Sequence, residues 1–322
     1  MRNILITGSE GNIGAFVSKH ASRHPNWHTI GVTRHSHAEP HTDQAIIGDL
    51  TDATFVSRLF AMYDIDTVIH AAAPAYRADV IMQDPYGTYA NDVLCFLNVL
   101  RYATSIKHLI YLSSATVYEG ATDGPFTEDL TERIPPPSSS VGVAKLASER
   151  ALRFWSAQHK IPHTNWRLFN VISPRESHAT PGGHVTVDFY RRLFVEHVPT
   201  LEIFGNGNQV RCFTWVEDVA DAIVRFADDT RTINQTFNLG GNEPVTLFQL
   251  KDLMLEIGAK HKLLPAGYAP KTKTGGTFFG TDSAMRIPSL EKTSTQLGWK
   301  APTSFRDCLE KFIDQAPRYA HH

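Results

Sequence analysis

Short apolar runs alternate with amphipathic stretches through the first half of the chain. Residues 3–7 form an apolar run that ends in glycine, as buried parallel strands do. The stretch after it repeats apolar side chains at helical spacing, with one face formed by Ile13, Phe16, Val17 and Ala21. The alternation continues with strand-like runs at 28–33, 44–50, 66–73, 108–114 and 163–171, and with helix-like stretches at 53–62, 85–105 and 139–159. This order predicts a parallel sheet covered by helices on both faces.

The regular alternation of predicted strands and helices ends after residue 172. A loop-like segment rich in serine, proline and glycine follows at 173–184, and the remainder mixes short helices, strands and turns. We therefore predict an α/β fold with a doubly wound, Rossmann-like parallel sheet over residues 1–171. Late segments near 212–240 are expected to return to this dinucleotide-binding domain, and residues 172–320 are expected to form a smaller C-terminal substrate-binding domain.

Composition narrows the class of protein. Hydrophobic residues make up 42% and charged residues 20% of the 322 residues, which is ordinary for a soluble globular protein. The net charge of −2 gives no electrostatic reason to expect a nucleic acid or a membrane as partner. No apolar run approaches the ~18 residues of a membrane span. The chain enters a strand pattern at once, so we expect no signal peptide.

Cysteine and histidine usage adds two expectations. The three cysteines, Cys95, Cys212 and Cys308, lie far apart in the sequence, which favours free thiols in a reducing compartment, the cytoplasm. Histidines cluster between residues 20 and 41, but no cysteine or carboxylate joins them at the spacing of metal ligands. We therefore expect no metal site.

The first strand leads into a glycine-rich turn. Gly8, Gly11 and Gly14 have the spacing G-x-x-G-x-x-G, with Asn12 and Ile13 between the last two. The spacing alone is a weak signal, but here a predicted strand enters the turn and a predicted helix leaves it. Glycine lets the backbone approach a pyrophosphate, and the start of the helix supplies N–H donors. These five residues are predicted to bind a dinucleotide cofactor, and a purely structural turn is the alternative.

The end of the second predicted strand bears on the choice of cofactor. An acidic residue about twenty positions beyond the glycine motif selects NAD by binding the ribose hydroxyls. Thr33, Arg34 and His35 occupy that region, and none is acidic. Arg34 is suited to neutralise a 2′-phosphate, which favours NADP over NAD, although a guanidinium stacked on adenine suits either.

Further motifs make the chain resemble an extended short-chain dehydrogenase/reductase of the nucleotide-sugar epimerase/dehydratase group. They are GDL (48–50), HAAA (70–73), SSATVY (113–118), RLFN (167–170), GNGNQVRCFTWVEDVADA (205–222), FNLGG (237–241) and LGW (297–299), besides the glycine turn. The resemblance covers nearly the whole chain and implies an NAD(P)-dependent enzyme. The further cofactor-binding residues that it implies are Asp49, Leu50, Ala71, Ala72, Asn91 and Lys145.

The resemblance also implies catalytic residues. Ser114 matches the hydroxyl that hydrogen-bonds the reacting oxygen of the substrate, and Lys145 matches the lysine that holds the nicotinamide ribose. The proton-carrying tyrosine of the family falls four residues before this lysine. Val141 stands there instead, and its side chain cannot exchange a proton.

Several side chains are candidates to replace the missing tyrosine. Tyr118 lies four residues after the catalytic serine, Tyr76 lies in the loop after HAAA, and Ser139 or Ser140 could relay a proton through water. Packing or substrate contact explains each tyrosine equally well. Of these candidates we place Tyr118 with Ser114 and Lys145 in the predicted catalytic set.

The residues after Ser114 narrow the reaction. The resemblance implies that dehydratases carry an Asp-Glu pair there and decarboxylases a Glu, whereas this chain has Ala115 and Thr116. Elimination and decarboxylation by the family route are therefore not expected. Epimerisation and ketone reduction need only hydride and proton transfer, and both remain open.

The substrate side of the resemblance rests on two residues besides Ser114. Arg211 resembles the arginine that grips the substrate diphosphate, and Asn170 resembles an asparagine that contacts the same group. Pairing of Arg211 with Glu217 or Asp218 is the structural alternative.

One substrate residue of the family is missing. Its second arginine falls at Phe279, so diphosphate binding is expected to be weaker, to be helped by Lys271 or Lys273, or to be replaced by another substrate.

Three functions are consistent with these residues. The first is an NAD(P)-dependent epimerase or ketoreductase acting on a nucleotide sugar or a related hydroxy or keto compound, with an atypical proton carrier. The second is a family member that binds cofactor and ligand without turnover, and the third is a non-redox lyase or isomerase that reuses the site. By the same resemblance, helices 85–105 and 139–159 would pair into a homodimer interface.

Overall fold

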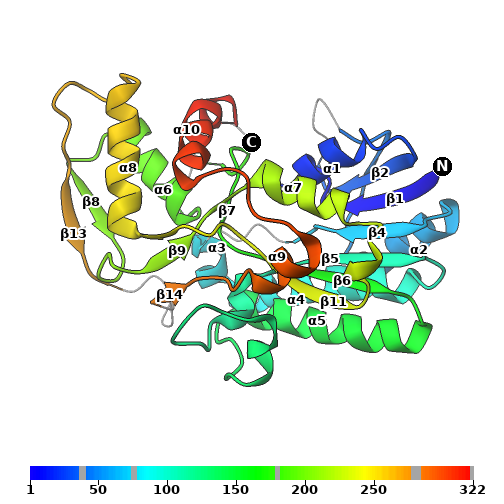
Figure 1. The fold of residues 1–322 in the computed structure, drawn as a ribbon. Coiled ribbons are helices and arrows are strands. Elements are labelled where there is room, and N and C mark those ends of the chain that lie inside the picture. The colour runs from blue at the N-terminus through cyan, green and yellow to red at the C-terminus, as the bar shows by residue number, and fades with distance from the viewer. Residues whose placement is uncertain (36–40, 74–77, 178–181, 277–283, 320–322) are drawn as a thin grey trace.

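The computed structural model describes residues 1–35, 41–73, 78–177, 182–276 and 284–319. Seven strands, all parallel, form its central sheet in the order β11-β6-β5-β4-β1-β2-β3 (Figure 1). These strands are β1 (Arg2–Thr7), β2 (Trp27–Thr33), β3 (Gln44–Ile47), β4 (Thr67–His70), β5 (His108–Ser114), β6 (His163–Leu168) and β11 (Gln235–Leu239). The strand order reverses beside β1, and ligands of such sheets bind at the carboxyl ends of the strands there.

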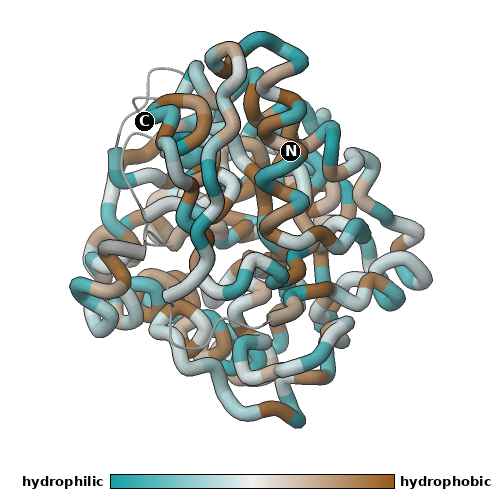
Figure 2. Tube along the Cα trace, turned by 90° about the vertical axis from the view of Figure 1, so that its left-hand side faces the viewer, coloured by the Kyte–Doolittle hydropathy of each residue, from teal (hydrophilic) through white to brown (hydrophobic). Residues whose placement is uncertain are grey.

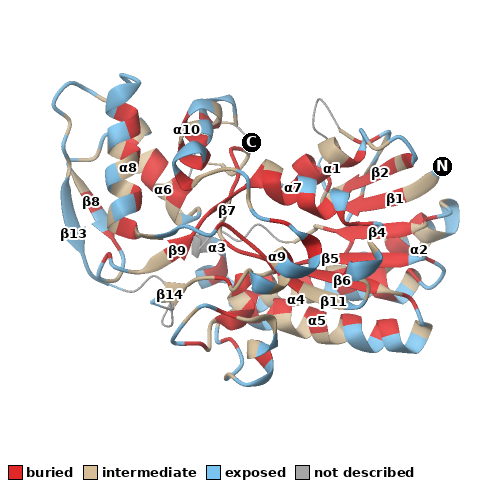
Figure 3. Ribbon diagram, viewed as in Figure 1, coloured by how far each residue is buried: buried red, intermediate tan, exposed pale blue. Residues whose placement is uncertain are grey.

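Helices cover both faces of this sheet. Alternate residues of a strand point to opposite faces, so Ile4 and Ile6 pack with α1 (Gly14–Ala21) and α7 (Val216–Arg225). Leu5 packs on the other face, which is covered by α2 (Ala53–Met62), α4 (Pro85–Tyr102) and α5 (Ser140–His159). Figure 3 shows β1, β2, β4, β5 and β6 buried along most of their length between these two layers. The doubly wound α/β fold predicted from the sequence is confirmed.

The second half of the chain adds three smaller sheets. They are β12 (Pro244–Thr246), β9 (Val210–Cys212) and β14 (Met285–Arg286); β13 (Lys271–Thr274) and β8 (Thr200–Ile203); and β10 (Thr214–Trp215) and β7 (Val171–Ile172). The other helices are α3 (Ala78–Gln83), α6 (Val185–Tyr190), α8 (Leu247–Lys260), α9 (Glu291–Leu297) and α10 (Phe305–Gln315). One hydrophobic cluster runs from the α1 face of the sheet into α6, α8 and α10. The domain boundary at residues 171 and 172 stays a prediction.

The described helices give no membrane span, since none is both long and apolar enough to cross a bilayer. Figure 2 shows hydrophobic and hydrophilic residues alternating along the elements, as amphipathic packing requires.

Three predicted strands end earlier than their apolar runs, and the first of them, 66–73, stops at His70. The run 163–171 is broken at Asn170, whose φ of +38° lies in the left-handed region that asparagine tolerates better than most residues, so β6 stops at Leu168. The run 44–50 stops at Ile47, because Asp49 closes a local turn in which its Oδ1 accepts hydrogen bonds of 2.8 Å from the backbone N and the Oγ1 of Thr51.

Candidate functional site

The glycine turn lies against the end of β4. Gly8 has a φ of +66°, and a Cβ there would come within 2.7 Å of the Ala72 Cα, so only glycine lets these two segments meet. A Cβ on Gly14 would lie 2.0 Å from the Gly8 carbonyl oxygen. Gly11 and Asn12 are exposed at the start of α1. The turn therefore has the close approach and the exposed backbone that a dinucleotide pyrophosphate requires.

The second half of the chain holds the turn from outside. Ser173 Oγ donates a hydrogen bond of 2.7 Å to the Asn12 carbonyl, and Arg175 Nη2 donates one of 3.1 Å to the Glu10 carbonyl. Ile13 precedes the first residue of α1 and packs against the main hydrophobic cluster. Residues beyond 172 therefore hold the glycine turn in place in addition to forming the smaller sheets.

The residues predicted for the adenosine end lie around the strand ends and α4. Asp49 and Arg34 are exposed, and Leu50 is buried with its carbonyl accepting a hydrogen bond of 2.8 Å from Asn98 Nδ2. Burial raises the pKa of the Cys95 thiol on α4 to about 12. The negative charge of Asp49 adds to this rise and the positive charge of Arg34 opposes it, so both charges lie near the thiol.

Two other predicted cofactor residues lie close to these elements. Ala71, like Ala72, directly follows β4, and its backbone N donates a hydrogen bond of 3.2 Å to the Thr7 carbonyl at the end of β1. Asn91 is exposed on α4. The role of these residues in cofactor binding stays a prediction.

Two of the three residues predicted for the chemistry, Ser114 and Lys145, lie on neighbouring elements. Ser114 ends β5, and its Oγ accepts a hydrogen bond of 3.2 Å from the Thr116 backbone N. Lys145 lies on α5 with only 4% of its surface exposed. Its Nζ is 3.2 Å from Asp92 Oδ1 and 5.4 Å from the centre of the Tyr111 ring. A buried ion pair thus lies beside the predicted nicotinamide end.

Asp92 is a site residue that the sequence reasoning missed, although a signal existed. Asp92, Phe96 and Val99 are buried at spacings of four and three residues on α4. That spacing places a carboxylate within the apolar stripe of an amphipathic helix. A charged residue in such a stripe needs a buried partner, and Lys145 supplies it.

The structure places Val141 one turn before Lys145 on α5, 8% exposed. Of the neighbouring hydroxyls, Ser139 Oγ caps the helix by accepting a hydrogen bond of 3.0 Å from the Gly142 N. Ser140 Oγ is buried and has no hydrogen-bond partner among the residues that the structure describes. Ser140 therefore has an uncommitted hydroxyl next to the position of the missing tyrosine.

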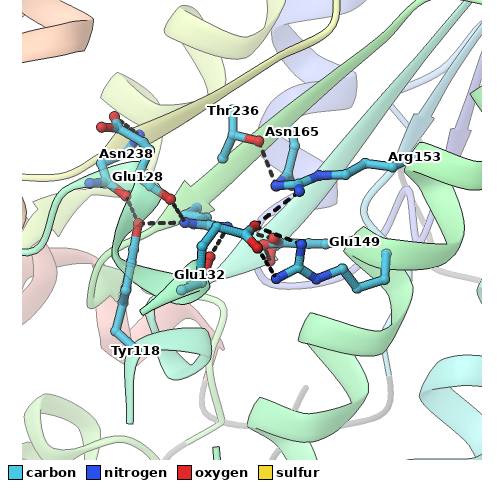
Figure 4. Close-up of polar contacts among 12 residues, drawn as sticks. Tyr118, Glu128, Glu132, Glu149, Arg153, Asn165, Thr236 and Asn238 are labelled. Atoms are coloured by element: carbon cyan, nitrogen blue, oxygen red, sulfur yellow. Dashed lines mark hydrogen bonds and ion pairs between the residues drawn. The ribbon is translucent and has the colours of Figure 1, made fainter. Parts of the chain in front are cut away.

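Tyr118 has a different environment from that of a proton carrier. It is fully buried, its hydroxyl donates a hydrogen bond of 2.7 Å to Asn238 Oδ1, and it accepts one of 2.8 Å from Arg167 Nη1 (Figure 4). Burial raises the pKa of the phenol well above its usual value. These contacts favour the packing alternative, to which we assign Tyr118. Tyr76 lies outside the described residues.

A buried ion pair with β6 and a hydrogen bond from β5 hold the helix of Lys145 against the sheet. Arg167 Nε and Nη2 donate to the two carboxylate oxygens of Glu149 at 3.0 and 2.7 Å, and Ser113 Oγ donates to Glu149 at 2.5 Å. Burial opposes ionisation of Glu149, but Arg167 outweighs it and the pKa of the carboxyl lies below its usual value. Glu149 is one turn beyond Lys145 on α5, and Ser113 directly precedes Ser114 on β5. This network therefore helps to set the distance between Lys145 and Ser114.

The residues predicted for the substrate meet at β9. Arg211 is 6% exposed on this strand, and Asn170 Nδ2 donates a hydrogen bond of 2.9 Å to the carbonyl of the next residue, Cys212. The carboxylates named as alternative partners bind elsewhere: Glu217 Oε1 and Oε2 lie 2.6 Å from Lys19 Nζ and His20 Nε2. Asp218 accepts hydrogen bonds from the backbone N and Oγ1 of Thr303.

The proposed replacements for the second arginine lie on a different sheet. Lys271 and Lys273 are exposed on β13, which pairs with β8 rather than with β9, and Lys273 Nζ is 2.8 Å from Glu202 Oε1. Phe279 lies outside the described residues. Within the described ranges, no group of three or more His, Cys, Asp or Glu side chains could hold a metal ion, and the three cysteines are free thiols.

Comparison with known proteins agrees with this geometry. The family described as the NAD dependent epimerase/dehydratase family matches residues 4–240. A dTDP-L-rhamnose 4-epimerase of Burkholderia thailandensis is 27% identical, covering 93% of this chain and 90% of that protein. A dTDP-glucose 4,6-dehydratase of Neisseria gonorrhoeae is 28% identical, covering 97% and 94%. The crystal structure of the UDP-glucose 4-epimerase of Thermotoga maritima with UDP-glucose superposes with a TM-score of 0.84 at 25% identity, covering 98% of this chain and 99% of that one.

Proposed function

Because this chain is an enzyme of the NAD-dependent epimerase/dehydratase family, we propose that it is an NAD(P)-dependent epimerase or ketoreductase acting on a nucleotide sugar. The observation that carries this proposal is the gathering of three features at the carboxyl ends of β1, β4 and β5. These are the glycine turn, Ser114 and the buried Lys145 of α5, whose Nζ is 5.4 Å from the centre of the Tyr111 ring on β5 and whose charge acts on His70 at the end of β4. That edge is where a doubly wound sheet binds a dinucleotide.

The chemistry divides between the cofactor and the chain. A bound nicotinamide supplies hydride transfer. Ser114 Oγ hydrogen-bonds the reacting oxygen of the sugar, and the Lys145 ammonium attracts the negative charge that develops there. The proton of the hydroxyl has no tyrosine to receive it. We assign its relay to the Ser140 hydroxyl, which makes no hydrogen bond within the described part of the chain, and to a water molecule that passes the proton to bulk solvent as its final acceptor. Loss of a positioned acid–base group costs about 10²–10⁴-fold in rate, or about 3–5 kcal/mol of barrier, so a slow enzyme remains.

The reaction type follows from the residues beside Ser114. Ala115 is 3% exposed and apolar, and Thr116 has a hydroxyl rather than a carboxyl. Neither can protonate a leaving hydroxyl as a carboxylic acid does. Epimerisation or ketone reduction is therefore favoured over the elimination named for the dehydratase relative.

The cofactor that we propose is NADP, with NAD accepted more weakly. Arg34 is exposed just beyond β2, and neither Thr33 nor His35 beside it is an acid that could bind the ribose hydroxyls. We predict that Arg34→Ala weakens NADP binding about tenfold and leaves NAD binding unchanged, because only NADP carries the phosphate that the guanidinium pairs with. Fluorescence titration with both cofactors measures this, and Arg58→Ala on α2 is the matched surface control. Equal losses for both cofactors would assign Arg34 to adenine stacking.

Two further parts of the proposal concern partner and place. Exposed apolar side chains lie on the two helices expected at a dimer interface, Leu94 and Leu97 on α4 and Val143 and Phe154 on α5. They support a homodimer, which sedimentation of the purified protein tests. Free thiols suit a reducing compartment, so we place the enzyme in the cytoplasm.

The alternative function is a protein that binds cofactor and ligand without turnover, and Val141 is the observation that favours it. The test is to add NADPH or NADH and then a panel of nucleoside-diphosphate sugars and their 4-keto forms, following nicotinamide fluorescence. Hydride transfer that Ser114→Ala abolishes supports the enzyme. Cofactor binding without hydride transfer, persisting in Val141→Tyr, supports the binding protein or a non-redox lyase.

A further inference from the structure

Segments far apart in the sequence meet around Glu10, inside the glycine turn. Glu10 is 6% exposed, and burial raises the pKa of its carboxyl, while the charges of Arg175 and then His41 oppose that rise. Arg175 Nη2 lies 3.7 Å from Glu10 Oε2, and the guanidinium carbon of Arg175 lies 5.5 Å from the centre of the Tyr319 ring. A buried carboxylate is costly without a counter-charge, and Arg175 brings one from the second half of the chain.

The same arginine also holds the backbone of the turn. Its Nη2 donates a hydrogen bond of 3.1 Å to the Glu10 carbonyl, and Ser173 Oγ donates one of 2.7 Å to the Asn12 carbonyl. Because a trans peptide unit is planar, its carbonyl and the N–H that follows point in opposite directions. A held Asn12 carbonyl therefore fixes the direction of the Ile13 N–H at the start of α1. Such N–H groups at a helix start are the donors that bind a pyrophosphate.

The segment that carries Ser173 and Arg175 has a firm base. The Arg175 backbone N donates a hydrogen bond of 3.3 Å to Ser173 Oγ, which joins the two residues. The segment directly follows β7, in which Val171 pairs with Thr214 of β10, and α7 begins directly after β10. Glu217 of α7 binds side chains of α1. The segment and the helix that follows the turn are therefore anchored on the same element, α7.

We propose that Arg175 is a positioning residue for the cofactor, which holds the glycine turn in its binding conformation through the carbonyl and the carboxylate of Glu10. This rests on the proposed function, because the turn is there expected to bind NAD(P), and it deepens that function by naming a residue that controls cofactor release. A turn without this hold samples other conformations, and its ordering costs free energy each time the cofactor binds. Arg175 acts through the turn and takes no part in hydride transfer.

The test measures cofactor release and the protection of the turn in variants. We expect Arg175→Gln to raise the release rate of NAD(P)H about tenfold, with a similar rise in Kd, because a bond from a charged donor is lost and affinity changes appear mainly in release. Nicotinamide fluorescence during a chase with excess oxidised cofactor measures this. In the cofactor-free protein, amide hydrogen exchange across residues 8–14 should become faster. KM for the cofactor rises more than kcat falls.

Two further variants keep the test specific. Arg175→Lys keeps the charge and loses the planar fork, so it should restore part of the affinity. Arg192→Gln is the matched control, because Arg192 Nη1 donates a hydrogen bond of 2.8 Å to the Glu202 carbonyl and lies 3.1 Å from Asp188 Oδ2, away from the turn. The side chains of Arg175 and Arg192 are 12% and 13% exposed. The control should leave release and exchange unchanged, and thermal unfolding of each variant checks that it folds.

The outcomes separate the role of Arg175 from the proposed function. A wild-type release rate in folded Arg175→Gln overturns the positioning role, and so do equal losses in Arg175→Gln and Arg192→Gln. Faster release and faster exchange in a protein that converts no nucleotide sugar leave the role of Arg175 standing, while the enzymatic function falls. A wild-type protein that binds neither NAD nor NADP contradicts both.

Discussion

Asp92 is the residue whose removal most directly probes the buried site. Its carboxylate pairs with the Lys145 ammonium at 3.2 Å, and both side chains are almost fully buried. We predict that Asp92→Asn lowers the free energy of unfolding by about 3 kcal/mol or more, because an ammonium without its counter-charge is costly in the interior. Urea unfolding measures this. The double variant Asp92→Asn/Lys145→Met is the control and should recover part of the loss. An unchanged single variant would contradict the account of the pair.

At the residue scale, the sequence predicted those site residues that are identified by a motif of their immediate neighbours in the chain. The glycines of the turn, Ser114 and Lys145 are specified by their motifs. The structure places the turn and Ser114 at the carboxyl ends of β1 and β5, and Lys145 on α5 beside Tyr111 of β5. The register that places Arg286 of β14 beside Arg211 of β9 could not be predicted, because pairing between strands far apart in the sequence depends on tertiary packing. Tyr118 illustrates the converse, since only the fold reveals that Arg167 and Asn238 engage its hydroxyl.

At the element scale, α1 and α7 are joined by one carboxylate. Glu217 on α7 binds both His20 and Lys19 of α1, the helix that follows the glycine turn. Hydrogen bonds from His20 and then Lys19 lower the pKa of Glu217 to about 2 against partial burial. The stabilisation is therefore complete above the unfolded pKa of about 4.5 and is lost as the pH falls toward 2.

We predict that Glu217→Gln lowers the free energy of unfolding by about 1–2 kcal/mol near neutral pH, after allowance for solvent screening of a half-buried group. The difference from the wild type should shrink as the pH falls toward 2. Urea titrations at several pH values measure it, and Glu196→Gln, which has its own arginine partner away from α1, is a matched control. A difference that stays constant with pH would show that packing rather than charge joins the helices.

Element boundaries were predictable where the apolar periodicity of a helix begins at a capping residue. The predicted helix 53–62 has those limits in the structure, because Asp52 caps its start by accepting a hydrogen bond from the Thr54 N. The run 163–171 misled, because a single asparagine with positive φ ends a strand without changing the apolar pattern. Apolar runs indicate burial, and β6 before the break and Ile172 after it are both buried.

At the scale of the whole molecule, three buried histidines make the fold sensitive to acid. Burial lowers the pKa of His70 to about 3 and those of His108 and His163 to about 4. In the unfolded chain these histidines take up protons near pH 6.5, which the buried imidazoles resist. The free energy of unfolding therefore keeps its full value above pH 6.5 and falls toward pH 4 by about 1.4 kcal/mol per group and pH unit. Stability measured across this range should decline steeply.

The variant His108→Gln tests the cause of this decline. Glutamine keeps a donor and an acceptor for the Ala227 carbonyl and Thr164 Oγ1 but cannot take up a proton. We expect its stability to vary less with pH between about 6.5 and 4 than that of the wild type. The exposed His261→Gln is the control and should leave the slope unchanged. Equal slopes in all three proteins would assign the acid sensitivity to other groups.

The central claim is that a chain with valine in place of the proton-carrying tyrosine still moves hydride. The most direct measurement is a single-turnover reaction of the cofactor-loaded enzyme with a nucleoside-diphosphate sugar, followed by nicotinamide absorbance. The account predicts slow hydride transfer in the wild type, at least about tenfold slower transfer in Ser114→Ala, and faster transfer in Val141→Tyr but not in the size-matched Val141→Phe. Bound cofactor whose absorbance never changes, in the wild type and in Val141→Tyr alike, would contradict it.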